Sequence, residues 1–239
     1  MVARRAVMTR TLEELVSEDS AWPVLLDWVE ASSLDVEIIE ADPDSRAASL
    51  LAAQVTTHSM LGALLWNCGA VSIDHGWIRL LGAGAGSLDG AHPQRLHDPR
   101  GDRMFDGVVV AYDVLGGRFA IHGGGLDAIP PGEVIYWAPD SLEWESTGKG
   151  HSAIVEFLLS GGVAEFYADL RWPGWEADSE GLAVDQGLSA YPFAWSREGR
   201  GPNVSRRAAP LHEIIAVAEE AARQLRGYPD GTPFDITFT

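Results

Sequence analysis

The stretch GVVVAYDVLGGRFAIH, residues 107–122, places two short apolar runs on either side of a glycine pair. Runs of this kind, rich in valine, isoleucine and aromatic residues and bounded by glycine, are typical of β-strands. The connection between them is too short for a crossover helix, so the two strands are expected to form an antiparallel hairpin. The sequence therefore predicts an antiparallel sheet built around this hairpin.

Other apolar runs before and after the hairpin have similar lengths and similar glycine-rich surroundings. The pattern predicts strands at residues 61–66, 70–73, 77–81, 107–112, 118–122, 134–137 and 142–145. Residues 82–106 are rich in glycine, proline and charge and have no periodicity. We expect this segment to form a long surface loop.

Helical periodicity dominates both ends of the chain. Thr11 and Glu14 have the spacing of a capping box before a first short helix. Apolar residues recur at helical spacing in 22–29, 154–158, 211–225 and, on a separate helix after Gly161–Gly162, in 163–170. Residues 45–57 also favour a helix. No gap in the apolar pattern is long enough to separate two cores. We therefore expect one α+β domain over residues 1–239, with a central, largely antiparallel sheet flanked by N-terminal and C-terminal helices.

Composition excludes several classes of partner. The chain has 239 residues and a formal net charge of −18, divided as −8 over residues 1–120 and −10 over 121–239. Such a charge repels nucleic acid and anionic lipid, and it speeds encounter with basic partners. The apolar stretches are too short to cross a membrane, and the first residues lack the apolar core of a secretory signal. Because Cys68 is the single cysteine, no internal disulfide can form. We expect a cytoplasmic protein, and its oligomeric state stays open.

Several catalytic or cofactor motifs begin in the sequence but are not completed. The element His122–Gly125 matches the HGGG motif of lipase-like hydrolases, yet no G-x-S-x-G nucleophile elbow follows it. Gly82, Gly84 and Gly86 form G-x-G-x-G, whereas a dinucleotide-binding site has the pattern G-x-G-x-x-G, with two residues before the third glycine. The seven histidines show no metal-ligand spacing. The sequence therefore predicts no catalytic residue, no metal and no cofactor, and it favours a non-enzymatic role.

Carboxylates lie close to tryptophans in part of the sequence, and they form a candidate surface for a partner or ligand. The set is Asp74, His75, Trp137, Asp140, Glu143, Trp144, Glu145, Trp172 and Trp175. Paired carboxyl groups beside aromatic rings suit a glycan or another small molecule, and they could serve a hydrolase. A half-buried strand at 142–145 would produce the same alternation by packing alone. Both interpretations stay open.

Longer strings resemble one bacterial family. TLEELVSEDSAWPVLLDWV, IDHGWIRLLG, APDSLEWE and RWPGWE are similar to sequences of the family known as domain of unknown function 2625. The resemblance runs from about Met8 over nearly the whole chain. Residues 1–7 are therefore expected to be a disordered N-terminal extension.

A second resemblance covers residues 75–160. The order AYDVLGG, RFAIHGG, GEVIYWAPDSLEWE and HSAIVEFLLSG is similar to the SUKH (Smi1/Knr4-like) superfamily of α+β binding domains, many of which are immunity proteins against secreted toxins. It implies a SUKH-like core with a tight turn at Gly116–Gly117, a dipeptide that is able to take positive φ at both positions.

With the net charge, the SUKH resemblance favours an acidic protein-binding module that docks a basic protein, such as a toxin domain. Reversing the charge of Glu143 and Glu145 is then expected to weaken binding of that partner. The alternative is a small-molecule or glycan-binding protein.

Overall fold

An antiparallel sheet of eight strands forms the centre of the computed structural model, which describes residues 9–201, 203–229 and 231–233. Its strands are β1 (Val36–Ile39), β2 (Ala70–Ile73), β3 (Ile78–Leu81), β6 (Pro93–Asp98), β7 (Arg103–Asp113), β8 (Arg118–Gly124), β9 (Glu133–Ala138) and β10 (Glu143–Gly150). They pair in the order β1-β2-β3-β7-β8-β9-β10, and β6 pairs with the first half of β7. Every pair is antiparallel, as the sequence predicts.

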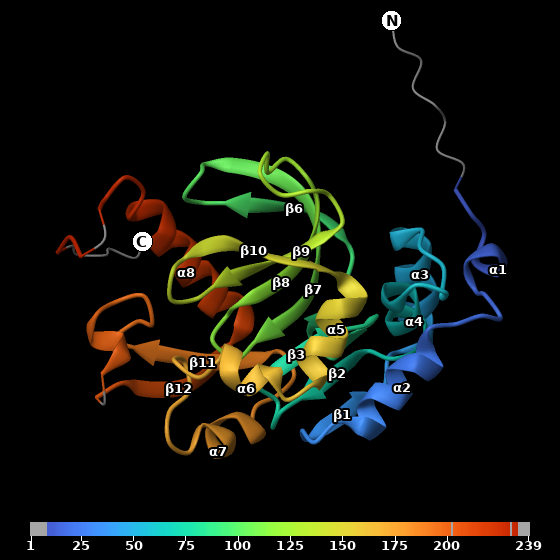
Figure 1. The fold of residues 1–239 in the computed structure, drawn as a ribbon, viewed down its shortest axis with the longest axis horizontal. Coiled ribbons are helices and arrows are strands. Elements are labelled where there is room, and N and C mark those ends of the chain that lie inside the picture. The colour runs from blue at the N-terminus through green and yellow to red at the C-terminus, as the bar shows by residue number, and fades with distance from the viewer. Residues whose placement is uncertain (1–8, 202, 230, 234–239) are drawn as a thin grey trace, which may run out of the picture.

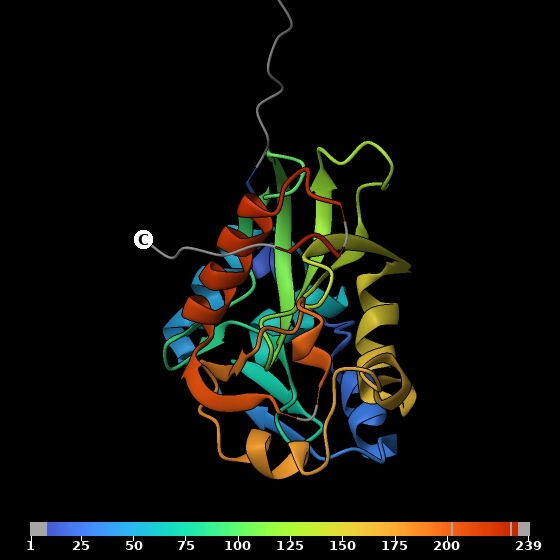
Figure 2. The ribbon, with the colours of Figure 1, turned by 90° about the vertical axis from the view of Figure 1, so that its left-hand side faces the viewer.

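Helices cover both faces of this sheet. They are α1 (Leu12–Leu15), α2 (Trp22–Ala31), α3 (Pro43–Ala53), α4 (Met60–Asn67), α5 (His151–Leu159), α6 (Gly162–Phe166), α7 (Trp175–Glu180) and α8 (Leu211–Gln224), with a 3-10 turn at Glu198–Arg200. Two small sheets pair β4 (Gly84–Ala85) with β5 (Leu88–Asp89) and β11 (Gln186–Tyr191) with β12 (Ser205–Pro210). Figures 1 and 2 show α8 and α5 on opposite sides of the sheet. The predicted α+β fold is thus confirmed.

The predicted strand at residues 61–66 is wrong, because these residues form most of α4. Every residue from Met60 to Leu65 is buried, so the helix is apolar on all sides. A short apolar run of this kind has no periodicity that distinguishes a buried helix from a buried strand. The helical start is set by Ser59, whose side chain accepts a hydrogen bond from the Gly62 amide at 3.1 Å.

The expected long surface loop at residues 82–106 is also wrong. The segment contains β4, β5, β6 and the first residues of β7. Leu88, Leu96 and Phe105 are buried in the core. The β6 sequence PQRLHD has one large apolar residue and no alternation, so its pairing with β7, rather than its own pattern, makes it a strand.

The turn between β7 and β8 differs from the predicted two-residue turn. Residues 114–117 form the connection, and only Gly116 has a positive φ, at 88°. Asp113 holds this turn through its side chain, which accepts hydrogen bonds from the amides of Leu115 and Gly117 at 2.9 and 2.8 Å. A Cβ on Gly117 would lie 1.9 Å from Asp113 Oδ2. Gly117 is therefore required for close approach of the carboxylate, not for its φ.

Residues 1–7, which the sequence predicts to be disordered, lie outside the described residues. The helices of the described ranges include none that is long and apolar enough to cross a bilayer.

The cap of α4 gives a first test of the fold. Replacing Ser59 with alanine removes the acceptor of the Gly62 amide, so the free energy of unfolding is expected to fall by about 1 kcal/mol. Urea unfolding followed by tryptophan fluorescence measures the loss. The matched control is alanine at Ser33, an exposed residue after α2, which should change stability by less than about 0.5 kcal/mol. Equal effects of the two substitutions would contradict the capping role.

Candidate functional site

The residues of the predicted surface separate into two groups. Asp74 and His75, in the turn after β2, contact the segment around Arg171 that also contains Trp172 and Trp175. The other five, Trp137, Asp140, Glu143, Trp144 and Glu145, lie along β9, β10 and the turn that joins them.

The first group is an internal charge cluster. Arg171 forms an ion pair with Asp74, and both side chains are nearly buried. The Arg171 guanidinium also lies 3.8 Å from the ring centroid of Trp175 and 4.9 Å from that of Trp77. Trp172 is covered by the guanidinium of Arg206 at 3.8 Å. The contacts of Arg171 therefore hold the segment after α6 against the turn between β2 and β3, and the contact of Arg206 holds the same segment against β12.

The two tryptophans of the second group also belong to the packing. Trp137 has no exposed surface, and its ring lies edge-to-face against Trp144, with 5.6 Å between centroids. The Arg118 guanidinium lies 5.1 Å from both ring centroids and forms an ion pair with Glu219 of α8 at 2.7 Å. These contacts join α8 to one face of the sheet, so neither ring is free to serve as a flat binding surface.

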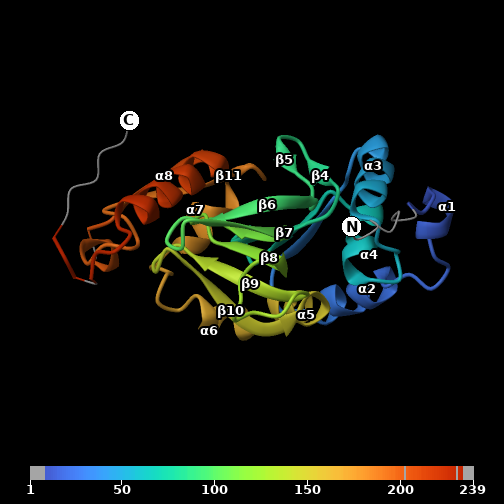
Figure 3. The same cartoon turned by 90° about the horizontal axis from the view of Figure 1, so that it is seen from above.

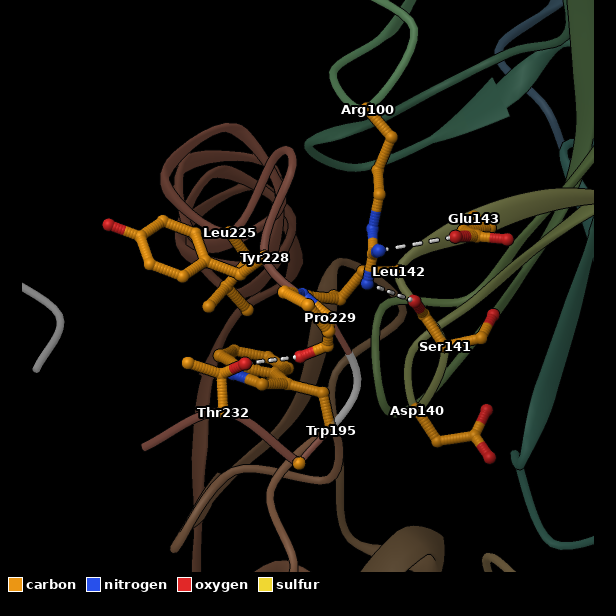
Figure 4. A pocket seen from close by; sticks show the side chains of 11 residues that line it. Arg100, Asp140, Ser141, Leu142, Glu143, Trp195, Leu225, Tyr228, Pro229 and Thr232 are labelled. Atoms are coloured by element: carbon orange, nitrogen blue, oxygen red, sulfur yellow. Dashed lines mark hydrogen bonds and ion pairs between the residues drawn. The ribbon is translucent and has the colours of Figure 1, made fainter. Parts of the chain in front are cut away.

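The carboxylates Asp140 and Glu143 line a cleft of about 380 Å³ beside the β9–β10 turn. Figure 4 shows Arg100 above this turn, with Trp195 and Tyr228 from the C-terminal part of the chain across the cleft. Arg100 Nη1 lies 3.3 Å from Glu143 Oε1, and Nη2 donates to the Ser141 carbonyl oxygen at 3.2 Å. The third guanidinium nitrogen, Nε, is buried and has no hydrogen-bond partner among the described residues.

The sequence did not indicate Arg100, Trp195 or Tyr228 as site residues. They lie far from Asp140 and Glu143 along the chain, and only the tertiary fold brings the five together. The aromatic run YPFAW at 191–195 was the available signal for Trp195. The cleft therefore combines two carboxylates, one guanidinium and two aromatic rings, a set that can bind a small polar molecule.

A different feature stands out at the other end of the molecule. Between residues 9 and 53 the chain has eleven acidic residues and two basic ones, a net charge of −9. These acids are Glu13, Glu14, Glu18, Asp19, Asp27, Glu30, Asp35, Glu37, Glu40, Asp42 and Asp44, and all are exposed. Half of the net charge is thus carried by α1, α2, β1, α3 and their connections, which Figures 1 and 3 place at one end, away from α8.

This acidic end, residues 9–53, also contains an open edge of the sheet. β1 is the last strand in the sheet order, and β2 is its one strand neighbour among the described residues. Glu37 lies within β1, with Asp35 before it and Glu40 after it. In the described ranges no carboxylate of the acidic end forms an ion pair. The β1 edge of the sheet therefore lies among carboxylates that have no ion-pair partner in the described part of the chain.

Metal-ligating side chains do not gather in the described part of the chain. No group of three or more histidine, cysteine, aspartate or glutamate side chains there is arranged to hold a metal ion.

Comparisons with known proteins place the chain among bacterial sequences. The family model described as protein of unknown function DUF2625 matches residues 12–214. A protein of Escherichia coli named putative uncharacterized protein YbfG is 36% identical over 214 residues, which cover 86% of this chain and 94% of that protein. An uncharacterized protein of Haemophilus influenzae is 32% identical over 185 residues, covering 74% of this chain and 79% of the relative. No solved structure matches the chain, so the SUKH-like core stays a prediction.

Proposed function

Starting from the fact that the chain belongs to the DUF2625 family, we propose that it is a protein-binding module whose acidic end docks a basic protein in the cytoplasm. The observation that carries this proposal is the gathering of eleven exposed carboxylates on residues 9–53, without an ion pair among the described residues. A toxin domain is the form of partner that the SUKH resemblance implies.

The negative charge of this surface affects both the rate at which a partner binds and the kind of partner that binds. A field of one sign raises the rate at which an oppositely charged protein is captured, and added salt weakens it. Like charge at the same time rejects acidic proteins. A basic partner is therefore expected to bind quickly and with a steep dependence on ionic strength.

The edge of β1 is the place where a partner could pair with the sheet. An exposed edge strand carries backbone N–H and C=O groups that another strand can pair with. A basic strand added beside β1 would bring its lysine and arginine side chains close to Asp35, Glu37 and Glu40. Val24, Leu26 and Leu51, which are 39–44% exposed on α2 and α3, add apolar surface in the same part of the chain. These contacts would supply burial beyond charge alone.

Charge reversal at the edge tests the proposal. The probe is a short peptide of alternating lysine and valine, and its affinity is measured by calorimetry at low and at physiological salt. The triple variant Asp35→Lys, Glu37→Lys and Glu40→Lys should bind it about tenfold more weakly or worse, because attraction becomes repulsion.

The matched control reverses three exposed acids outside the acidic end, namely Glu165, Glu176 and Glu180 on α6 and α7. This control has the same net charge as the edge variant and should keep most of the affinity. Equal losses in the two variants would show that total charge, rather than the β1 edge, binds the peptide, and would refute the proposed docking site.

A further inference from the structure

The cleft beside the β9–β10 turn is distinct from the acidic end. None of the residues that line it belongs to residues 9–53. Its volume of about 380 Å³ lies within the range of small-molecule sites. A ligand of this cleft and a protein on β1 would therefore occupy different surfaces, and tests of the two proposals can fail separately.

One wall of the cleft is polar and planar. The Arg100 guanidinium and the Glu143 carboxylate, 3.3 Å apart, offer donors and acceptors side by side, and Asp140 and Ser141 extend this wall. Planar side chains of this kind can each engage two neighbouring hydroxyl groups. Arg100 Nε, which is buried and unpartnered among the described residues, is a donor still to be satisfied.

The facing wall is aromatic. Trp195 and Tyr228 line it, together with Leu142 and Leu225. The Trp195 ring stacks on Phe193 at a centroid distance of 4.4 Å and an angle of 6°. Phe193 does not line the cleft, whereas Trp195 does, and Trp195 also packs against the buried cluster that contains Leu142 and Ala218. The Trp195 Nε1 donor is also buried without a partner in the described ranges.

The charges in the cleft select against ionic ligands. Arg100 and Glu143 compensate each other's charge in an ion pair, so neither is left to bind an ion of opposite sign, and the two carboxylates of the lining disfavour an anion. What fits is a neutral molecule with a ring of hydroxyl groups and an apolar face. We infer that the cleft binds a neutral saccharide, with the apolar face of a sugar ring on Trp195 and its hydroxyl groups toward Arg100 and Glu143.

The test is titration of the whole protein with four neutral disaccharides, cellobiose, maltose, lactose and chitobiose, followed by NMR of the indole N–H signals. The Trp195 signal, assigned with a Trp195→Phe variant, should shift saturably with at least one of them. Trp195→Ala should weaken that sugar by about tenfold, because the stacked face is lost, whereas Trp195→Phe should keep most of the affinity.

A second variant keeps the test valid if Trp195→Ala does not fold. Arg100→Met keeps the length of the side chain and removes its donors, and it should also weaken the sugar by about tenfold. Trp172→Phe, a change outside the cleft, is the matched control and should leave binding unchanged. Inorganic phosphate and spermidine serve as ionic probes. The inference is overturned if none of the four sugars shifts the Trp195 signal, if the Arg100→Met variant binds as well as wild type, or if an ionic probe binds in their place.

Discussion

Replacing Asp113 with alanine is expected to lower the free energy of unfolding by about 3–5 kcal/mol, one of the two largest effects that we predict. Asp113 has no exposed surface. One carboxylate oxygen accepts from the amides of Leu115 and Gly117, and the other accepts from the hydroxyls of Tyr136 at 2.6 Å and Tyr167 at 3.2 Å. Alanine would leave four donors without their acceptor beneath the β7–β8 turn.

The control for this prediction is Asp113→Asn, which keeps the shape and one acceptor oxygen and should lose much less stability. Urea unfolding at constant pH compares the two variants with wild type. A loss below about 1 kcal/mol in Asp113→Ala would contradict the role given to this carboxylate.

The titration of Asp113 adds a pH signature. Burial raises the pKa of the Asp113 carboxyl, opposed in part by the hydrogen bond from Tyr136. Because the folded protein then holds the proton more tightly than the unfolded chain, this group contributes most stability below its unfolded pKa of about 4. That contribution is lost as the pH rises through the folded pKa. The Asp113→Asn variant should lack this part of the pH dependence.

The second large effect is expected at Arg171. Replacing it with methionine leaves the Asp74 carboxylate, whose side chain is 8% exposed, without its ion-pair partner. It also removes the cation from the rings of Trp77 and Trp175. Breaking a buried pair from one side costs about 3–5 kcal/mol, because a charge stays behind in a medium that solvates it poorly.

A double variant, Arg171→Met with Asp74→Asn, separates the stranded charge from lost packing. The second substitution makes the side chain at position 74 neutral, and asparagine tolerates the backbone there, where φ is 58°. The double variant should therefore recover part of the stability lost in Arg171→Met. If urea unfolding shows it to be no more stable than the single variant, the buried charge is not the cause of the loss.

The fold could be predicted from the sequence where a local signal exists. The run at residues 118–122 is bounded by glycine and gave β8 correctly. The run at 61–66 has no periodicity, and the cap at Ser59 is what distinguishes α4 from a strand. β6 has one buried leucine and no local strand pattern. It is a strand because it pairs with β7, and the sequence of β6 alone does not indicate this pairing.

The candidate sites also contain residues that the sequence could indicate and residues that only the tertiary fold brings together. Asp140 and Glu143 are close in sequence and could be recognised as a pair, but Arg100 and Trp195 reach them only through the tertiary fold. The acidic end could have been predicted from the sequence by counting charge over shorter segments. Counting charge over the two halves of the chain hides it, because residues 54–120 are nearly neutral, whereas residues 9–53 alone have a net charge of −9.

The central claim, that a basic segment docks on the edge of β1, is tested most directly by backbone hydrogen exchange in the presence of the lysine–valine peptide. Amides of residues 36–39 should exchange more slowly with the peptide than without it, and a glutamate–valine peptide should have no effect. Unchanged exchange at β1 under saturating peptide, or slowing confined to the opposite edge strand β10, would contradict the account.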